Sequence, residues 1–164
     1  ICGAIFLTCF EFSNLDCTRA EKGRDIPMSI EENKAIVRRY QEIYNSNNVE
    51  ALNDVVAEDL LTPRMMPGMP QGLEGAKKIH RGTLLGMPDW HTQIEDLIAE
   101  GDKVVARITM TGTHTGDFFG FPATGKKISF TGIYIVQIAN GKIIEHWGEE
   151  DSVGLLQQLG AMPT

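Results

Sequence analysis

The chain has 164 residues, a formal net charge of −7 at pH 7 and 42% hydrophobic residues. This length fits one domain with a short appendage. The acidic balance argues against nucleic-acid binding, which requires a basic surface. No apolar run approaches the roughly 20 residues that cross a bilayer. We therefore expect a cytoplasmic protein with neither a nucleic-acid nor a membrane partner.

The first 27 residues differ in character from the rest. Cys2, Cys9 and Cys17 all lie within this stretch, which leaves no cysteine for a disulfide framework or a thiolate metal site further along. A short apolar run is followed by a polar segment, and a signal-peptide remnant is one interpretation. We favour an N-terminal extension of unknown role, residues 1–27, followed by one domain at residues 28–164.

Helical patterns fill the first part of this domain. Ser29 and Glu32 form an S-x-x-E capping box. Behind them, apolar residues at i, i+4 and i+7 predict an amphipathic helix that ends at the Asn and Ser residues 45–48. A short second helix is predicted around residues 52–56. The proline- and glycine-rich segment that follows forbids a long regular element. A third helix is predicted from about Leu73 to Leu85.

The hydrophobic period changes towards two after the third helix. Strands are predicted at residues 90–99, 103–113, 127–139 and 142–149, and a closing helix at residues 151–159. Asn140-Gly141 is a strong hairpin signal, because a type I′ turn requires positive φ at both central residues. Helices followed by an antiparallel meander predict an α+β fold rather than alternating βαβ units.

Three segments resemble a known family when taken in order. They are IVRRYQEIYNSNNVEAL, GTHTGDFFGFPATGKKISFTG and NGKIIEHWGEEDSVGLLQQLG. Together they resemble the SnoaL-like polyketide cyclases, also described as ester cyclases, of the nuclear-transport-factor-2-like (cystatin-like) superfamily. The resemblance covers roughly Met28 to Met162.

The resemblance implies a fold, a class of ligand and an assembly. The fold is a cone-shaped, curved antiparallel sheet wrapped around three N-terminal helices, with a pocket at the open end. The ligand is a small hydrophobic molecule that contains carbonyl groups. The implied reaction is an aldol-type cyclisation or isomerisation by acid/base catalysis without a cofactor. The assembly is a homodimer formed through the outer face of the sheet.

The resemblance also implies site residues. Asp151, just before the last helix, falls at the place of the general acid/base. His114 falls at the place of the family's histidine at the start of the central loop, and we expect His114 or Tyr44 to stabilise an enolate oxygen. Tyr44 and Tyr134 fall at pocket positions in the first helix and the long strand.

Each of these residues also has a simpler interpretation. Asp is a favoured helix N-cap, so Asp151 could serve only as a cap. Strand alternation puts Trp147 on the face of Glu149 and Asp151, which favours a stacking wall for a flat ligand. Trp90 is a further pocket candidate, with core packing as its alternative. The four scattered histidines lack metal-ligand spacing, so we predict no metal site.

Three other functions remain open from the sequence. A non-catalytic binding module would use the same cone to hold an apolar ligand. Epoxide-hydrolase-like chemistry needs an Arg-x-Asp pair, but the sequence has Thr109 two residues after Arg107. Ketosteroid-isomerase-like chemistry needs a tyrosine and a neutral carboxylic acid as oxyanion donors, of which the tyrosines supply half.

Overall fold

The computed structural model describes residues 28–63 and 68–163, so the predicted extension at residues 1–27 lies outside the described part. The described chain begins with helix α1 (Ile30–Asn45), whose start is fixed by the predicted capping box. The Glu32 backbone N–H donates to Ser29 Oγ at 3.2 Å, and the Ser29 N–H donates to Glu32 Oε2 at 2.7 Å. Two backbone donors at the helix start are thereby satisfied.

A 3₁₀ turn (Val49–Ala51) and the one-turn helix α2 (Leu52–Val55) follow α1. Val56 was predicted to continue this helix, but it begins strand β1 (Val56–Leu61). β1 runs parallel to β5 (Lys142–Glu150) at the edge of the sheet. The local pattern of apolar residues fits either a helix or a strand. Residues 56–61 form a strand because they pair with the edge of β5, which is distant in sequence.

The five-stranded sheet has the order β1-β5-β4-β3-β2. Strands β2 (His91–Glu100), β3 (Lys103–Thr113), β4 (Lys127–Ala139) and β5 form an antiparallel meander. Asn140 and Gly141 join β4 to β5 with φ values of 51° and 76°, as the predicted hairpin requires. The α+β prediction is therefore confirmed, with one parallel edge strand added.

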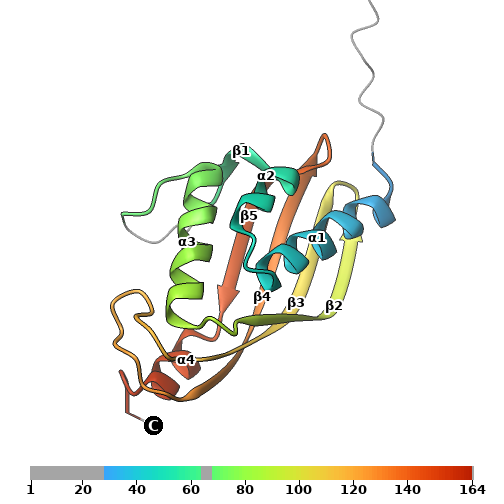
Figure 1. Cartoon of the computed structure of the whole chain (residues 1–164). Helices are drawn as coiled ribbons and strands as arrows, with labels where there is room; N and C mark the ends of the chain where they lie inside the picture. The colour runs from blue at the N-terminus through green and yellow to red at the C-terminus, as the bar shows by residue number, and fades with distance from the viewer. Residues whose placement is uncertain (1–27, 64–67, 164) are drawn as a thin grey trace, which may run out of the picture.

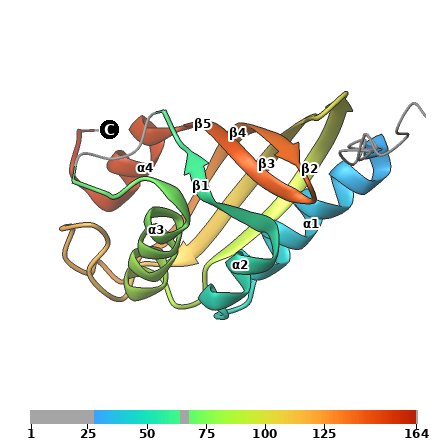
Figure 2. The same ribbon diagram turned by 90° about the horizontal axis from the view of Figure 1, so that it is seen from above.

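Helices α1 and α3 (Gly72–Gly86) cover one face of the curved sheet, as Figures 1 and 2 show. Val37, Tyr40 and Ile43 of α1 belong to a single buried core with the inward residues of β3 and β4. The last helix, α4 (Ser152–Leu159), lies at one end of the sheet rather than across it (Figure 1). At that end, Ser152, Leu155 and Leu156 of α4 line the cavity described below.

The cap at Ser29 gives a direct test of how α1 is anchored. We predict that Ser29→Ala lowers the free energy of unfolding by about 1 kcal/mol, because a backbone donor loses its partner. Ser29→Asp keeps an acceptor oxygen and should stay close to wild type. Urea unfolding followed by circular dichroism measures both, and equal midpoints for all three proteins would contradict the role given to the cap.

Candidate active site

A cavity of about 570 Å³ lies between the concave face of the sheet, α1, α3 and the loop between β3 and β4. This volume falls in the range of small-molecule sites. Its wall is mostly aromatic and aliphatic, with a few polar groups. The residues that line it include Gln41, Tyr44, Thr83, Trp90, Phe118, Phe119, Phe121, Phe130, Tyr134, His146 and Glu150.

The pairing of β4 with β5 decides which side chains of β5 enter the cavity. His146, Gly148 and Glu150 stand opposite Val136, Tyr134 and Gly132, all of which are buried inward positions of β4. Alternation along the strand therefore turns His146 and Glu150 inward. Gly132 leaves space for the carboxylate, since a Cβ there would come within 3.2 Å of Glu150 Cγ.

Glu150 carries the acidic chemistry of the cavity. It keeps access to solvent through the cavity, yet the surrounding protein excludes enough water to raise the pKa of its carboxyl group above the usual range. Neither lysine nor arginine is among the residues that line the cavity. A carboxyl group in such surroundings can exchange a proton closer to neutral pH than an exposed one.

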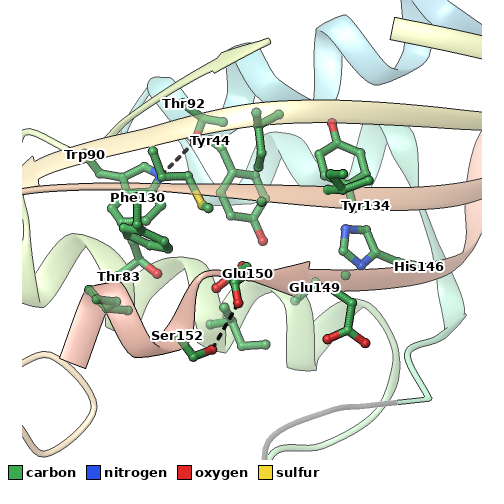
Figure 3. Close-up of a pocket in the computed structure, with 18 of the residues that line it drawn as sticks. Tyr44, Thr83, Trp90, Thr92, Phe130, Tyr134, His146, Glu149, Glu150 and Ser152 are labelled. Atoms are coloured by element: carbon green, nitrogen blue, oxygen red, sulfur yellow. Dashed lines mark hydrogen bonds between the residues drawn. The ribbon is translucent and has the colours of Figure 1, made fainter. Parts of the chain in front are cut away.

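Tyr44 points its hydroxyl group towards Glu150, as Figure 3 shows. Its neighbour Asn45 fixes the end of α1 on β2: Asn45 Nδ2 donates to the Thr92 carbonyl at 2.8 Å, and Thr92 N–H donates to Asn45 Oδ1 at 2.7 Å. The ring of His80 stacks on Tyr44 with centroids 4.3 Å apart. Burial raises the pKa of Tyr44, so its hydroxyl stays protonated and available as a donor.

His146 and Tyr134 form a second polar group beside Glu150. Their rings stack with centroids 5.2 Å apart. Burial lowers the pKa of His146 to about 4, so the imidazole is neutral at pH 7. Burial also raises the pKa of Tyr134, whose hydroxyl oxygen accepts a hydrogen bond from Gln41 Nε2 at 2.7 Å. This side of the cavity is therefore polar and uncharged.

The opposite side of the cavity is apolar. Trp90 packs edge-on against Phe130 at 5.9 Å between centroids, and its Nε1–H donates to Thr92 Oγ1 at 3.0 Å. Phe118 and Phe119 approach α3 closely because Gly86 and Gly82 carry no side chain. A Cβ at Gly86 would come within 2.6 Å of Phe118 Cβ. The glycines thus let the loop close one end of the cavity with aromatic rings.

The structure places the predicted site residues unequally. Tyr44, Tyr134 and Trp90 all line the cavity. Asp151 does not: it is exposed and caps α4, accepting the Gly154 N–H on Oδ1 at 2.9 Å. The absence of a side chain at Gly154 gives the Asp151 carboxylate room for this contact. The neighbouring residue Glu150 occupies the place in the cavity that the sequence suggested for Asp151.

His114 and Trp147 also lie away from the cavity lining. His114 is fully buried, with Nδ1 3.0 Å from Thr124 Oγ1 and Nε2 3.2 Å from the Phe121 carbonyl, so both nitrogens hold the loop in place. Trp147 stands opposite Ile135 on the outer face, with Lys103 Nζ 5.8 Å from its ring centroid. Trp147 and Glu149 share one face of β5, as the sequence predicted, but this is the outer face of the sheet and not the face that carries the cavity.

Sequence reasoning missed four residues around the cavity. Glu150 and His146 have the strand parity of the inward residues of β5, and the hairpin register could have found them. Gln41 follows the core residue Tyr40 on α1, and nothing in the helical pattern marks it. His80, one of the four scattered histidines, is fully buried, because the side of α3 that carries it faces Tyr44 of α1.

Two further sequence predictions concern other kinds of site. Arg107 lies on the outer face and pairs with Asp96 at 2.7 Å, so it supplies no cavity group for epoxide-hydrolase-like chemistry. Within residues 28–63 and 68–163, no three His, Cys, Asp or Glu side chains are grouped as a metal site needs. In the same part of the chain, no helix combines the length and the apolar character needed to cross a membrane.

These features define a cone-shaped α+β domain with a small-molecule cavity that opens to solvent. The family model of the SnoaL-like polyketide cyclases matches residues 34–159, and the chain belongs to this family. The predicted resemblance is confirmed. The match includes most of α1, the cavity strands and α4.

Named relatives and solved structures agree with this family. The aklanonic acid methyl ester cyclase DauD of Streptomyces sp. (strain C5) is 29% identical over 76% of this chain and 80% of its own length. The nogalonic acid methyl ester cyclase of Streptomyces nogalater is 25% identical over 71% of this chain and 89% of its own length. TsrD from Streptomyces laurentii superposes with a TM-score of 0.76 at 30% identity, covering 82% of this chain and 99% of TsrD. These relatives favour a cyclase over the competing enzyme classes.

The electrostatics of the cavity give a prediction that needs no substrate. We expect the His146 imidazole to titrate with a pKa of about 4, because the neutral ring is favoured where water is excluded. Proton NMR of the histidine Cε1–H signals as a function of pH measures this value. The His146 signal is assigned by its loss in His146→Gln. A midpoint near the ordinary value of about 6.5 would show that the ring is open to solvent.

Proposed function

We propose that this protein catalyses an aldol-type ring closure of a small hydrophobic molecule containing carbonyl groups, with Glu150 as the acid/base. The observation that supports it is the inward carboxyl group with a raised pKa, which faces a tyrosine hydroxyl inside an apolar cavity. The sequence pointed to Asp151 for this role, but Asp151 caps α4 and is not among the residues that line the cavity, whereas Glu150 is.

The reaction divides into two proton transfers. The Glu150 carboxylate removes a proton from a carbon next to a substrate carbonyl, and the Tyr44 hydroxyl donates a hydrogen bond to the resulting enolate oxygen. The enolate carbon then attacks a second carbonyl carbon of the same molecule, and a carbon–carbon bond forms. The protonated Glu150 returns its proton to the new alkoxide. Substrate and product have the same mass, and no redox partner is required.

The aromatic side of the cavity supplies binding rather than chemistry. Trp90 and Phe130 offer flat apolar surfaces to the body of the substrate. Such a wall holds the two reacting carbons together and excludes water from the enolate. A cavity that served only for binding would have no need of a carboxyl group whose pKa is raised by the surrounding protein.

Two neighbouring carboxylates provide the test: Glu150 at the end of β5 and Asp151 at the start of α4. Aklanonic acid methyl ester and nogalonic acid methyl ester, the compounds that the relatives are named for, serve as the probe substrates. Liquid chromatography with mass spectrometry detects a product of unchanged mass. We predict that Glu150→Gln lowers the rate by roughly 10²- to 10⁴-fold. Asp151→Asn keeps a capping oxygen and should stay near the wild-type rate.

The outcomes separate the assignments. Loss of turnover in Asp151→Asn with full activity in Glu150→Gln would return the role to Asp151. Binding of both esters without turnover by the wild-type protein would favour the binding module. The pH dependence of kcat/KM gives a further test. kcat/KM should rise with pH as the Glu150 carboxylate forms, with a midpoint above the ordinary pKa of glutamate. This rise should be missing in Glu150→Gln.

The assembly is a separate proposal about the outer face of the sheet. Four apolar residues lie in direct register across four strands: Ile98, Val105, Ile135 and Trp147. Ile98 is 66% exposed and Ile135 is 39% exposed, and the nearby Ile133 is 50% exposed. A contiguous apolar row on an uncovered sheet face favours contact with a second copy of the chain. We propose that a homodimer covers this row.

A charge placed in the row should separate the two copies. We predict that Ile135→Lys gives a monomer in light scattering at micromolar concentration, while the wild-type protein has twice the monomer mass. Ile30→Lys is the matched control, because Ile30 is 44% exposed but lies at the start of α1, away from the sheet face. A wild-type monomer, or an unchanged Ile135→Lys dimer, would contradict this interface.

A further inference from the structure

Gln41 and Tyr134 meet at the polar side of the cavity. Two of their groups, the Tyr134 hydroxyl proton and the Gln41 amide oxygen, are available for a hydrogen bond to a ligand. Gln41 Nε2 donates to the Tyr134 hydroxyl oxygen at 2.7 Å. That hydroxyl can therefore direct its own proton elsewhere. Gln41 Oε1 is buried and has no hydrogen-bond partner among residues 28–63 and 68–163. One donor and one acceptor thus lie on adjacent side chains that both line the cavity.

Both side chains are held firmly in this arrangement. Gln41 is 6% exposed on α1, and Tyr134 is 4% exposed on β4. The Tyr134 ring is stacked on His146 and meets Tyr40 edge-on, with centroids 5.2 Å and 6.3 Å away. An unmade hydrogen bond at a buried amide destabilises the folded protein. A ligand group that completes the pair removes this destabilisation.

We infer that Gln41 and Tyr134 form a subsite that recognises a neutral hydroxyl group, phenolic or alcoholic, on the ligand. A hydroxyl oxygen accepts from the Tyr134 hydroxyl, and the hydroxyl proton is donated to Gln41 Oε1. A ketone or an ether can make only the first bond. A carboxylate would set its charge beside an acceptor oxygen in a cavity lined by neither lysine nor arginine, so the subsite disfavours it.

The inference rests on the proposed function for the identity of the cavity, and it deepens that function by giving the ligand an orientation. The hydroxyl group lies at the Gln41 and Tyr134 side. The flat apolar body extends towards Trp90 and Phe130, which Figure 3 shows on the other side of the Tyr44–Glu150 pair. A carbonyl group between these two ends then lies close to the acid/base. Gln41 is in this way a specificity residue rather than a catalytic one.

The test uses three aromatic probes of similar size that cannot be cyclised. They are 1-naphthol, 1-methoxynaphthalene, which lacks the proton, and 1-methylnaphthalene, which lacks both functions. Isothermal titration calorimetry gives each dissociation constant. We expect wild-type protein to bind 1-naphthol roughly three- to tenfold more tightly than 1-methoxynaphthalene, as one hydrogen bond contributes.

Variants then assign the preference to its residues. Gln41→Met keeps the side-chain length but removes the amide, and it should bring the ratio of the two constants close to one. Tyr134→Phe should reduce the preference for 1-naphthol over 1-methylnaphthalene. Thr83→Val is the matched control, because it removes a cavity hydroxyl from α3 on the other side and should leave both ratios unchanged. The affinity for 1-methylnaphthalene reports whether each variant keeps an intact cavity.

Three results would overturn the subsite. They are equal binding of 1-naphthol and 1-methoxynaphthalene by the wild-type protein, a preference that persists in both Gln41→Met and Tyr134→Phe, and no binding of any probe. If Gln41→Met does not fold, Tyr134→Phe still decides. Because no probe contains a carbonyl group, these results are independent of turnover. The proposed reaction can therefore fail in the Glu150→Gln experiment while the subsite stands, or the reverse.

Discussion

The antiparallel pairing of β4 with β5 is the constraint on which the cavity depends. Six consecutive residues, His146 to Asp151, contain three carboxylates, a histidine and a tryptophan. Register with Gly132, Tyr134 and Val136 puts His146, Gly148 and Glu150 on the inner face of β5, and of the two residues between them only Glu149 also borders the cavity. A shift of one residue would replace His146 and Glu150 with Trp147 and Glu149 on the cavity side, and the chemistry would change completely.

Glycine makes this pairing usable. Gly132 lies directly across from Glu150, where a side chain would crowd the carboxylate, and Gly148 separates Glu150 from His146 on the same strand. Gly82 and Gly86 play a similar part on α3, where they admit Phe118 and Phe119. The shape of the cavity therefore depends on these glycines as well as on the curvature of the sheet.

The elements that sequence predicts best are those with strong local signals. The capping box at Ser29 and the Asn140-Gly141 turn fix the start of α1 and the β4–β5 hairpin through contacts between neighbours in sequence. Strand β1 could not be found in this way, because its partner β5 lies some eighty residues away. Tyr44 and Tyr134, which were placed through the resemblance, line the cavity, and so does Trp90, for which core packing was the alternative. Asp151 does not line the cavity. It is the N-cap of α4, and the inward position at the end of β5 belongs to the preceding residue, Glu150.

Two of the three described residues that have buried polar atoms without a partner lie at the cavity or beside it. Among the described residues, the buried side-chain atoms without a partner belong to Asn33, Gln41 and His80. Gln41 lines the cavity and His80 stacks on Tyr44, which also lines it. Burial lowers the pKa of His80, and the Tyr44 backbone nearby opposes this shift without completing a hydrogen bond. Glu150 adds a desolvated carboxyl group to the same region.

A folded chain tolerates such groups where they act on something else, because a packed apolar core of the same volume would be more stable. Local rules broken together at one place mark a functional site more often than a packing accident. The polar groups of this cavity differ in kind: a proton-exchanging carboxyl group, a neutral imidazole, and a paired hydroxyl and amide. Binding an apolar molecule requires none of them. Holding a molecule by its hydroxyl group while moving a proton at a neighbouring carbon requires both the pair and the carboxyl group.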